Sequence, residues 1–185
     1  MDILVTFDEN YIPPFKTMLK SFMINNPGQS ATFWLIHDGI EEKKLQDLIH
    51  FCLSHGAKLE HICISKNYFE NAKITKRYPQ SMYYRLLAPL ILPETLDKIL
   101  YLDPDTLIIN ALSSLWETEF PEGKFYAAAS HAIVGYLTDD INKLRLDIDH
   151  SYFNTGVILM NLTEARKVVD ADEIIKTVKE SRNIE

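Results

Sequence analysis

Two aspartates that stand two residues apart, Asp103 and Asp105, are the residues of this 185-residue chain whose type and spacing most directly suggest chemistry. They follow an apolar stretch at residues 99–102 that predicts a strand, and a second apolar stretch at 107–109 comes after them. In an extended chain residues i and i+2 point to the same side, so we expect both carboxylates to face one way. Pro104 lacks an N–H group for a neighbouring strand, which predicts that regular pairing ends there. Because unpaired buried charges are costly, the pair must meet solvent, a basic group or a metal ion.

Three interpretations of this acidic pair stay open at this point. A hard divalent cation such as Mg²⁺ or Mn²⁺ prefers oxygen ligands and commonly takes one or two protein carboxylates beside substrate phosphates and water. A surface turn that merely ends a strand is the second interpretation. The third is the D-x-D-x-T motif of haloacid-dehalogenase-type phosphatases, with Asp103 as nucleophile, Asp105 as general acid, and residues 139–140 as the distal acidic pair. That family places its motif on the first strand, whereas three strand–helix units precede the motif here, so we rank this interpretation lower.

Composition limits the classes of protein to which the chain belongs. A net charge of −7 and a pI of about 5.4 describe a surface that repels phosphate backbones, so we do not expect nucleic-acid binding as the main role. No apolar stretch reaches the ~18–20 residues that span a bilayer, and the N-terminus lacks the features of a signal peptide. Cys52 and Cys63 lack metal-type spacing, and Cys52 falls on the apolar face of a predicted helix, which indicates a reduced, buried thiol. We therefore expect a cytoplasmic protein.

Alternating strand and helix patterns predict the elements that position the acidic pair. Apolar strand patterns occupy residues 3–7, 32–37, 59–64 and 99–102. Helical spacing of apolar residues lies between them, and the expected helices include Phe15 to Met23, Leu45 to Leu53 with Gly56 just past the end, and residues 81–92. This order predicts an α/β fold with a mainly parallel sheet, right-handed crossovers and helices on both faces.

Ligands of such sheets bind beyond the carboxyl ends of the strands. Asp8 and Asp103 each follow a predicted strand, so we expect both on the same edge. The second half of the chain is less regular, with strand patterns at 125–129 and 156–161. A capping-box pattern at Asp170 then predicts a last helix.

Four motifs in order resemble family 8 glycosyltransferases. They are MDILVTFDENY at 1–11, YYRL at 83–86, ILYLDPDTLI at 99–108 and YFNTGVILMNL at 152–162. The resemblance is closest to the bacterial lipopolysaccharide galactosyltransferases, extends to glycogenin-like enzymes, and covers essentially the whole chain. It implies a GT-A (Rossmann-like) fold, with residues 1–185 forming a single nucleotide-sugar-binding domain. It also implies a UDP-sugar donor, Mn²⁺ or Mg²⁺ as cofactor, and transfer of a hexose with retention at the anomeric carbon.

The resemblance also assigns roles to individual residues. It implies that the exit of the first strand contacts uridine and that Arg85 bridges the donor and the acidic edge, where its fork of N–H donors suits oxygen ligands. It makes Asp103 and Asp105 the metal ligands and places residues 154–156 beside the donor sugar, where glycine permits a close backbone approach. The expected donor-binding residues are Thr6, Asp8, Asn10, Tyr11, Arg85, Asp103, Pro104, Asp105, Asn154, Thr155 and Gly156.

Three departures from the family pattern modify these expectations. The family's third metal ligand is a histidine in an H-x-x-G-x-x-K segment, and none of the six histidines has glycine three residues later. The family's acidic-Gln segment is also missing, and Ala129, Ser130 and His131 stand where close relatives carry an aspartate, so galactose is not assumed as the sugar. We therefore expect an N-terminal part of a longer enzyme, with weak metal binding and little activity by itself.

The expected acceptor of the whole enzyme is a glycan or a lipopolysaccharide-type glycolipid, and the hexose is galactose or glucose. A peripheral position at the inner face of the membrane is a further expectation for that longer protein. A non-catalytic domain that binds nucleotide sugars is the alternative function from a different class.

Overall fold

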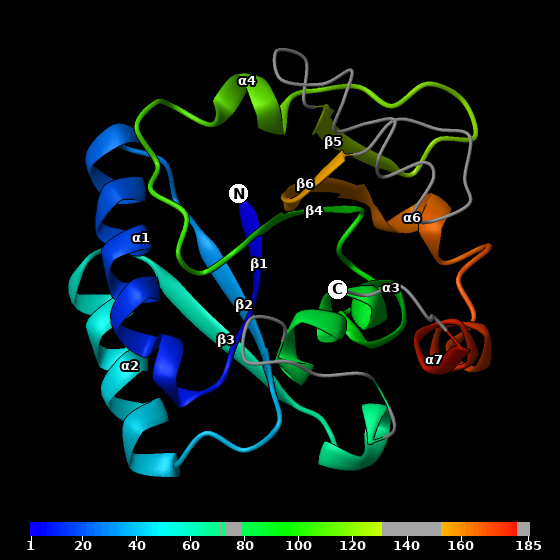
Figure 1. Ribbon diagram of the computed structural model, residues 1–185. Helices are drawn as coiled ribbons and strands as arrows, with labels where there is room; N and C mark the ends of the chain where they lie inside the picture. Colours follow the sequence, from blue (N-terminus) through cyan, green and yellow to red (C-terminus); the bar gives the residue numbers. More distant parts are fainter. Residues whose placement is uncertain (71, 73–78, 131–152, 181–185) are drawn as a thin grey trace, which may run out of the picture.

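The fold is a mixed α/β arrangement around one twisted sheet (Figure 1). The structure is a computed structural model, and it describes residues 1–70, 72, 79–130 and 153–180. Its first half contains β1 (Asp2–Thr6), η1 (Glu9–Tyr11), α1 (Ile12–Asn25), β2 (Thr32–His37), α2 (Glu42–Ser54), β3 (Lys58–Cys63) and η2 (Lys66–Phe69). The later elements are η3 (Gln80–Leu87), α3 (Ala88–Ile91), β4 (Lys98–Leu102), α4 (Ser113–Trp116), β5 (Tyr126–Ser130), β6 (Phe153–Asn161), α6 (Leu162–Ala165) and α7 (Ala171–Glu180).

The six strands lie in the order β3-β2-β1-β4-β6-β5. The first four strands along the chain pair in parallel, as the alternation of strands and helices predicts. β6 runs antiparallel to both β4 and β5. The prediction of a mainly parallel α/β sheet is thus confirmed, and the irregular second half of the sequence supplies its antiparallel edge.

Helices cover both faces of this sheet, as expected, and Figure 1 shows α1 and α2 on one side with α3 and α7 on the other. The α1/α2 face buries apolar side chains at helical spacing. They are Phe15, Met18, Leu19 and Phe22 of α1 and Leu45, Leu48 and Cys52 of α2. The opposite face, which we call the η3 face, buries Phe69, Tyr83, Tyr84, Leu87, Ala88, Tyr101, Leu162 and Val178.

The end of α2 agrees with the sequence prediction in two respects and differs in one. Cys52 is a buried free thiol, and burial raises its pKa to about 12. Gly56 follows the helix at φ +81°, where its N–H donates to the carbonyl of Leu53 and that of Ala57 donates to Cys52, the Schellman arrangement. Leu53, predicted on the apolar face, is 57% exposed because it lies one residue beyond the buried stripe.

The helix predicted over residues 81–92 is instead a 3₁₀ helix, η3, followed by the short α3. At the junction with α3, Pro89 has no N–H to donate to the carbonyl of Arg85, as continued α-helical bonding would require. The N–H of Ala88 donates to that carbonyl instead, three residues back. With three residues per turn, Ser81, Tyr84 and Leu87 line up on one side, and all three are buried.

The last helix begins as its sequence predicts. The carboxylate of Asp170 accepts a 3.0 Å hydrogen bond from the N–H of Glu173 at the start of α7. Just before this helix, Arg166 donates to the carbonyls of Pro89 (3.1 Å), Pro93 (2.8 Å) and Leu96 (2.8 Å). This guanidinium therefore ties α6 to the segment between α3 and β4, a contact that no sequence pattern predicted.

Candidate functional site

The carboxyl ends of β1 and β4 lie side by side, because these strands pair in parallel with Ile3 opposite Leu100 and Leu4 opposite Tyr101. Asp8 and Asp103, which follow these strands, therefore come to the same edge of the sheet, as expected. Ligands of open α/β sheets bind at such an edge.

The predicted acidic pair lies on a turn rather than on an extended strand. β4 ends at Leu102, and the N–H of Asp103 makes the last bond to β6, donating to the carbonyl of Gly156 at 2.8 Å. The carbonyl of Asp103 then accepts from the N–H of Thr106 at 3.0 Å, with Pro104 inside this turn. The prediction that pairing ends at Pro104 is confirmed. The i, i+2 strand argument was wrong, because Asp105 is exposed on the turn while Asp103 is half-buried.

The carboxylate of Asp103 is held by two side chains from different elements. The hydroxyl of Tyr101 donates to Oδ1 at 2.6 Å, and Nη1 of Arg85 lies 3.3 Å from the same oxygen. Arg85 reaches this position from η3 and also donates to the carbonyl of Thr155 at 2.8 Å. Its guanidinium carbon lies 4.9 Å from the ring centre of Tyr101. The structure thus brings Arg85 and Thr155 to Asp103, three residues that the sequence singled out separately.

Gly156 lies against the other carboxylate oxygen. A Cβ atom added to this glycine would be 2.6 Å from Oδ2 of Asp103, closer than two such atoms can approach. Its N–H donates to Oδ1 of Asn154, an exposed residue, at 2.8 Å. The glycine therefore makes room for the carboxylate, and this close approach is its structural role.

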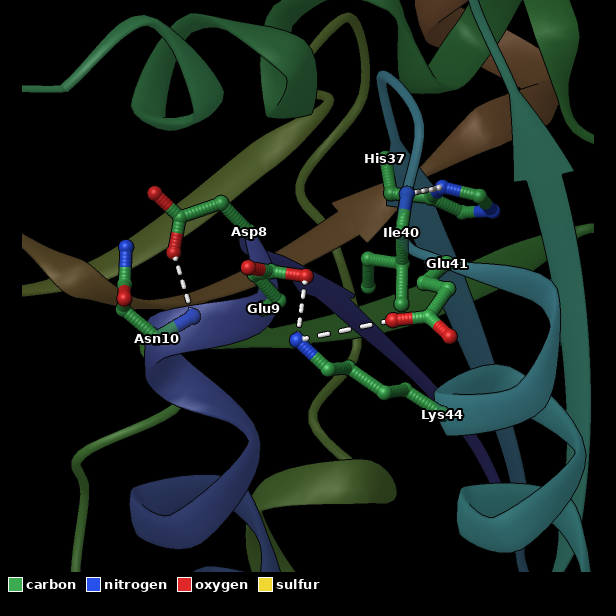
Figure 2. Close-up of polar contacts among 7 residues, drawn as sticks. All are labelled: Asp8, Glu9, Asn10, His37, Ile40, Glu41 and Lys44. Atoms are coloured by element: carbon green, nitrogen blue, oxygen red, sulfur yellow. Dashed lines mark hydrogen bonds and ion pairs between the residues drawn. The ribbon is translucent and has the colours of Figure 1, made fainter.

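The predicted uridine contacts lie at the exit of β1 (Figure 2). There the carboxylate of Asp8 accepts from the N–H of Asn10 at 2.9 Å and caps the single turn of η1. Asn10 is exposed, and Tyr11 is half-buried against the α1/α2 core. Thr6 is 3% exposed, and its hydroxyl has no hydrogen-bond partner among the described residues.

An open pocket of about 280 Å³ adjoins this exit, between the starts of α1 and α2. Of the predicted site residues only Asn10 lines it, together with oppositely charged side chains such as Lys44 and Glu9, which pair with each other at 2.8 Å. Asp103 does not line this pocket, and Lys44 and Glu9 already pair with each other, so we do not regard it as the functional site.

Oxygen donors at the edge suit a hard divalent cation. Both hydrogen bonds from described residues to the Asp103 carboxylate go to Oδ1, so Oδ2 keeps its lone pairs, and the carboxylate of Asp105 is exposed nearby on the turn. Among the described residues no group of three or more His, Cys, Asp or Glu side chains is arranged to hold a metal. His131 and the acidic residues at 139–140 lie outside the described residues, as does the side chain of Ser130.

Tyr101 is the site residue that the sequence analysis missed. The spacing of Tyr101 and Asp103 in the sequence could have predicted this contact, because residues i and i+2 of a strand lie on the same face of the sheet. Tyr84, which packs in the η3-face cluster, does not contact the carboxylate of Asp103; burial and the nearby carboxylate of Asp38 raise the pKa of its hydroxyl. Within the part of the chain that the structure describes, no helix has the length and hydropathy needed to span a membrane.

Comparison with known proteins places this edge in context. The chain is 28% identical over 158 residues to a lipopolysaccharide 1,2-glucosyltransferase of Escherichia coli, covering 85% of this chain and 46% of that protein. It is 24% identical over 182 residues to general stress protein A of Bacillus subtilis, covering 97% of this chain and 62% of that protein. The chain thus spans about half of the length of such relatives.

The fold agrees with these sequence likenesses. A crystal structure of the galactosyltransferase LgtC in complex with donor and acceptor sugar analogues superposes with a TM-score of 0.83 at 25% identity, covering 97% of this chain and 66% of that one. The expected GT-A fold is thereby confirmed. The sequence profile of glycosyl transferase family 8 matches residues 2–185. The resemblance seen in the four motifs is therefore correct, and the chain belongs to glycosyl transferase family 8.

Proposed function

We propose that this chain is the donor-binding part of a retaining glycosyltransferase that transfers galactose or glucose from a UDP-sugar to a glycan or lipopolysaccharide-type acceptor. The observation that carries the proposal is the acidic edge itself. Asp103 lies beyond β4 with Oδ1 held by Tyr101 and Arg85, and its Oδ2 is left for another ligand. Two relatives are a lipopolysaccharide 1,2-glucosyltransferase and a lipopolysaccharide 1,3-galactosyltransferase, which supports this choice of sugars and acceptor.

The proposed metal ligands are Asp103 and Asp105. Mn²⁺ or Mg²⁺ bound to these carboxylates would act as a Lewis acid toward the diphosphate leaving group. The chain's own contribution is positioning, since Asp103 is fixed by its neighbours while Asp105 stays exposed and adaptable. With two protein ligands, the affinity for the metal should be low.

The remaining site residues surround this pair. We assign Arg85 to the donor diphosphate or sugar, because its guanidinium reaches the edge and is already aligned by Asp103 and by the carbonyl of Thr155. Residues 154–156 would contact sugar hydroxyls, and the amide nitrogen of the exposed Asn154 side chain is a suitable donor. Pro104 would shape the turn between the two ligands.

Uridine is assigned to the exit of β1. Thr6, Asp8, Asn10 and Tyr11 would bind its base and ribose, with hydrogen bonds from the first three side chains and stacking by the tyrosine ring. The exposed side chain of Asn10 supports this assignment. No catalytic base or nucleophile belongs to the proposal.

Residues 1–185 would form one nucleotide-sugar-binding domain of a longer cytoplasmic enzyme, since the relatives named above contain substantially more chain. Membership of family 8 also removes the reason for the phosphatase interpretation of the acidic pair.

Calorimetry tests the proposal on the chain itself. We expect UDP to bind in preference to ADP and GDP, Mn²⁺ to strengthen UDP binding, and Asp103→Ala/Asp105→Ala to abolish that gain. The matched control is Asp172→Ala/Glu173→Ala, which removes the same charge from exposed positions of α7. UDP binding without any effect of Mn²⁺ would refute the metal role. Metal-dependent release of phosphate without nucleotide preference would instead restore the phosphatase hypothesis.

A further inference from the structure

Tyr101 connects the hydrophobic interior with the acidic edge. It is the next-to-last residue of β4 and 1% exposed, and its ring packs in the η3-face cluster. The hydroxyl of Tyr101 lies at the border of that cluster and donates to Oδ1 of Asp103 at 2.6 Å. The two side chains are two residues apart and lie on the same face. Packing therefore fixes the tyrosine, and the tyrosine in turn fixes the carboxylate.

The contact is short enough to be energetically important. Hydrogen bonds from a hydroxyl to an ionised carboxylate measure about 2.5–2.7 Å and are roughly twice as strong as neutral ones. The second bond to Oδ1, from Arg85, is longer at 3.3 Å, and Arg85 shares its donors with the carbonyl of Thr155. Tyr101 also supports Arg85, whose guanidinium carbon lies 4.9 Å from the ring centre.

The carboxylate is confined from the opposite side as well. Oδ2 occupies the space that a Cβ atom at Gly156 would fill, 2.6 Å from the position of that atom. Between the Tyr101 hydroxyl on Oδ1 and the backbone of Gly156 near Oδ2, the plane of the carboxylate has little freedom. Oδ2 is then the oxygen presented to a cation.

We propose that Tyr101 is a positioning residue of the metal site, whose hydroxyl holds Oδ1 of Asp103 so that Oδ2 faces the bound cation. The inference rests on the proposed function, because it takes Asp103 to be a metal ligand. Partners that orient metal ligands in this way typically change metal affinity by about 10–100-fold when they are removed.

The test compares wild-type protein with Tyr101→Phe. Mn²⁺ affinity is measured without nucleotide by electron paramagnetic resonance, and UDP affinity is measured by calorimetry with and without Mn²⁺. We expect Tyr101→Phe to bind Mn²⁺ about 10-fold more weakly and to lose a similar part of the Mn²⁺-dependent gain in UDP affinity. UDP affinity without metal should fall less than UDP affinity in the presence of Mn²⁺, because the ring and the Arg85 contact remain. Tyr101→Leu, which also removes the ring, should weaken metal-free UDP binding as well.

Tyr84→Phe is the matched control. Tyr84 belongs to the same buried cluster, and its hydroxyl lies near Asp38 rather than on Asp103, so the same loss of one oxygen should leave Mn²⁺ affinity unchanged. Thermal unfolding shows whether each variant is folded.

The outcomes separate the inference from the proposed function. If Tyr101→Phe is folded and binds Mn²⁺ like wild type, while Asp103→Ala/Asp105→Ala does not, the metal site stands and the role of Tyr101 is refuted. If Tyr84→Phe weakens Mn²⁺ binding as much as Tyr101→Phe does, the effect comes from the cluster and not from the hydroxyl on Asp103, and the inference is also refuted. If wild-type protein shows neither Mn²⁺ binding nor a Mn²⁺-dependent gain in UDP affinity, the metal role of Asp103 and Asp105 is refuted, and the inference about Tyr101 is refuted with it.

Discussion

The two faces of the sheet are built from aromatic residues of different kinds. On the α1/α2 face three phenylalanines meet edge to face, with Phe33 at 5.4 Å from Phe15 and 5.8 Å from Phe22, centre to centre. On the η3 face the large rings include three tyrosines, Tyr83, Tyr84 and Tyr101. Phenylalanine contributes buried area alone, whereas a buried tyrosine brings a hydroxyl that requires a partner.

This difference assigns separate tasks to the two faces. The α1/α2 face stabilises the parallel strands through apolar burial, and changes there should affect the free energy of unfolding. The η3 face also buries a core cluster, but polar groups on that side connect it to the acidic edge, from Tyr101 to Asp103 and from Arg85 to Thr155. Small chemical changes on that side should alter ligand binding more than stability.

The largest expected effect is on stability, from Phe33→Ala. This side chain of β2 is fully buried against Phe15 and Phe22 of α1, so its loss should lower the free energy of unfolding by about 3–5 kcal/mol. Urea unfolding measures the change, and Leu53→Ala, at an exposed position of α2, should shift it by less than about 0.5 kcal/mol. At a temperature where the variant is folded, its Mn²⁺-dependent gain in UDP affinity should match wild type. A specific loss of that gain would show that the two faces are not separate in their tasks.

The second prediction concerns Gly156→Ala, which should weaken metal-dependent UDP binding strongly while changing stability little. The new Cβ atom would meet Oδ2 of Asp103 at 2.6 Å, so the carboxylate must move away from its present position. We expect the Mn²⁺-dependent gain in UDP affinity to fall by about 10–100-fold, as for other losses of ligand orientation. Stability should change by no more than about 1 kcal/mol, since alanine suits a strand at least as well as glycine. UDP affinity without Mn²⁺ serves as the internal control. If the Mn²⁺-dependent gain in UDP affinity does not change, the position of Oδ2 is unimportant for metal binding.

Sequence patterns predicted the α1/α2 face better than the η3 face. Strand and helix periods place Phe15, Phe22 and Leu45 correctly because such periods are local. Apolar spacing alone did not distinguish the 3₁₀ winding of η3 from an α-helix, and it overlooked Pro89, which interrupts α-helical bonding at the junction with α3. The contact from Arg85 to Thr155 joins residues 70 positions apart, and no local period encodes such a distance.

The acidic edge shows the same division. Parallel alternation correctly brought Asp8 and Asp103 to one edge, because that follows from topology. The turn at Pro104 and the orientation of the Asp103 carboxylate follow instead from side-chain contacts with Tyr101 and Gly156. Family resemblance identified which residues belong to the edge, and packing alone explains how they are held.

One polar group lies at the border of the α1/α2 face. His37 ends β2 and is 3% exposed, and its Nδ1 accepts from the N–H groups of Gly39 (3.2 Å) and Ile40 (3.1 Å), the latter drawn in Figure 2. Nδ1 must therefore be unprotonated, so the proton lies on Nε2, which is 3.3 Å from Nδ1 of His61. Burial and the neighbouring His61 lower the pKa of His37, against the smaller opposing influence of Asp38.

The smallest expected effect is the pH dependence that follows from this neutral histidine. His37 in the unfolded chain becomes protonated below the ordinary histidine pKa of about 6.5, whereas His37 in the folded protein is still neutral there. The free energy of unfolding therefore falls as the pH drops from about 6.5 toward the lowered folded pKa. We expect roughly 1 kcal/mol, the net worth of a hydrogen bond lost at Nδ1. Urea unfolding between pH 7.5 and pH 5 measures it. His37→Asn keeps an acceptor for the turn without titrating, so its stability should depend less on pH than that of wild type. His50→Asn, at an exposed position of α2, should retain the wild-type dependence, and equal pH profiles for both variants would show that His37 is not the group responsible.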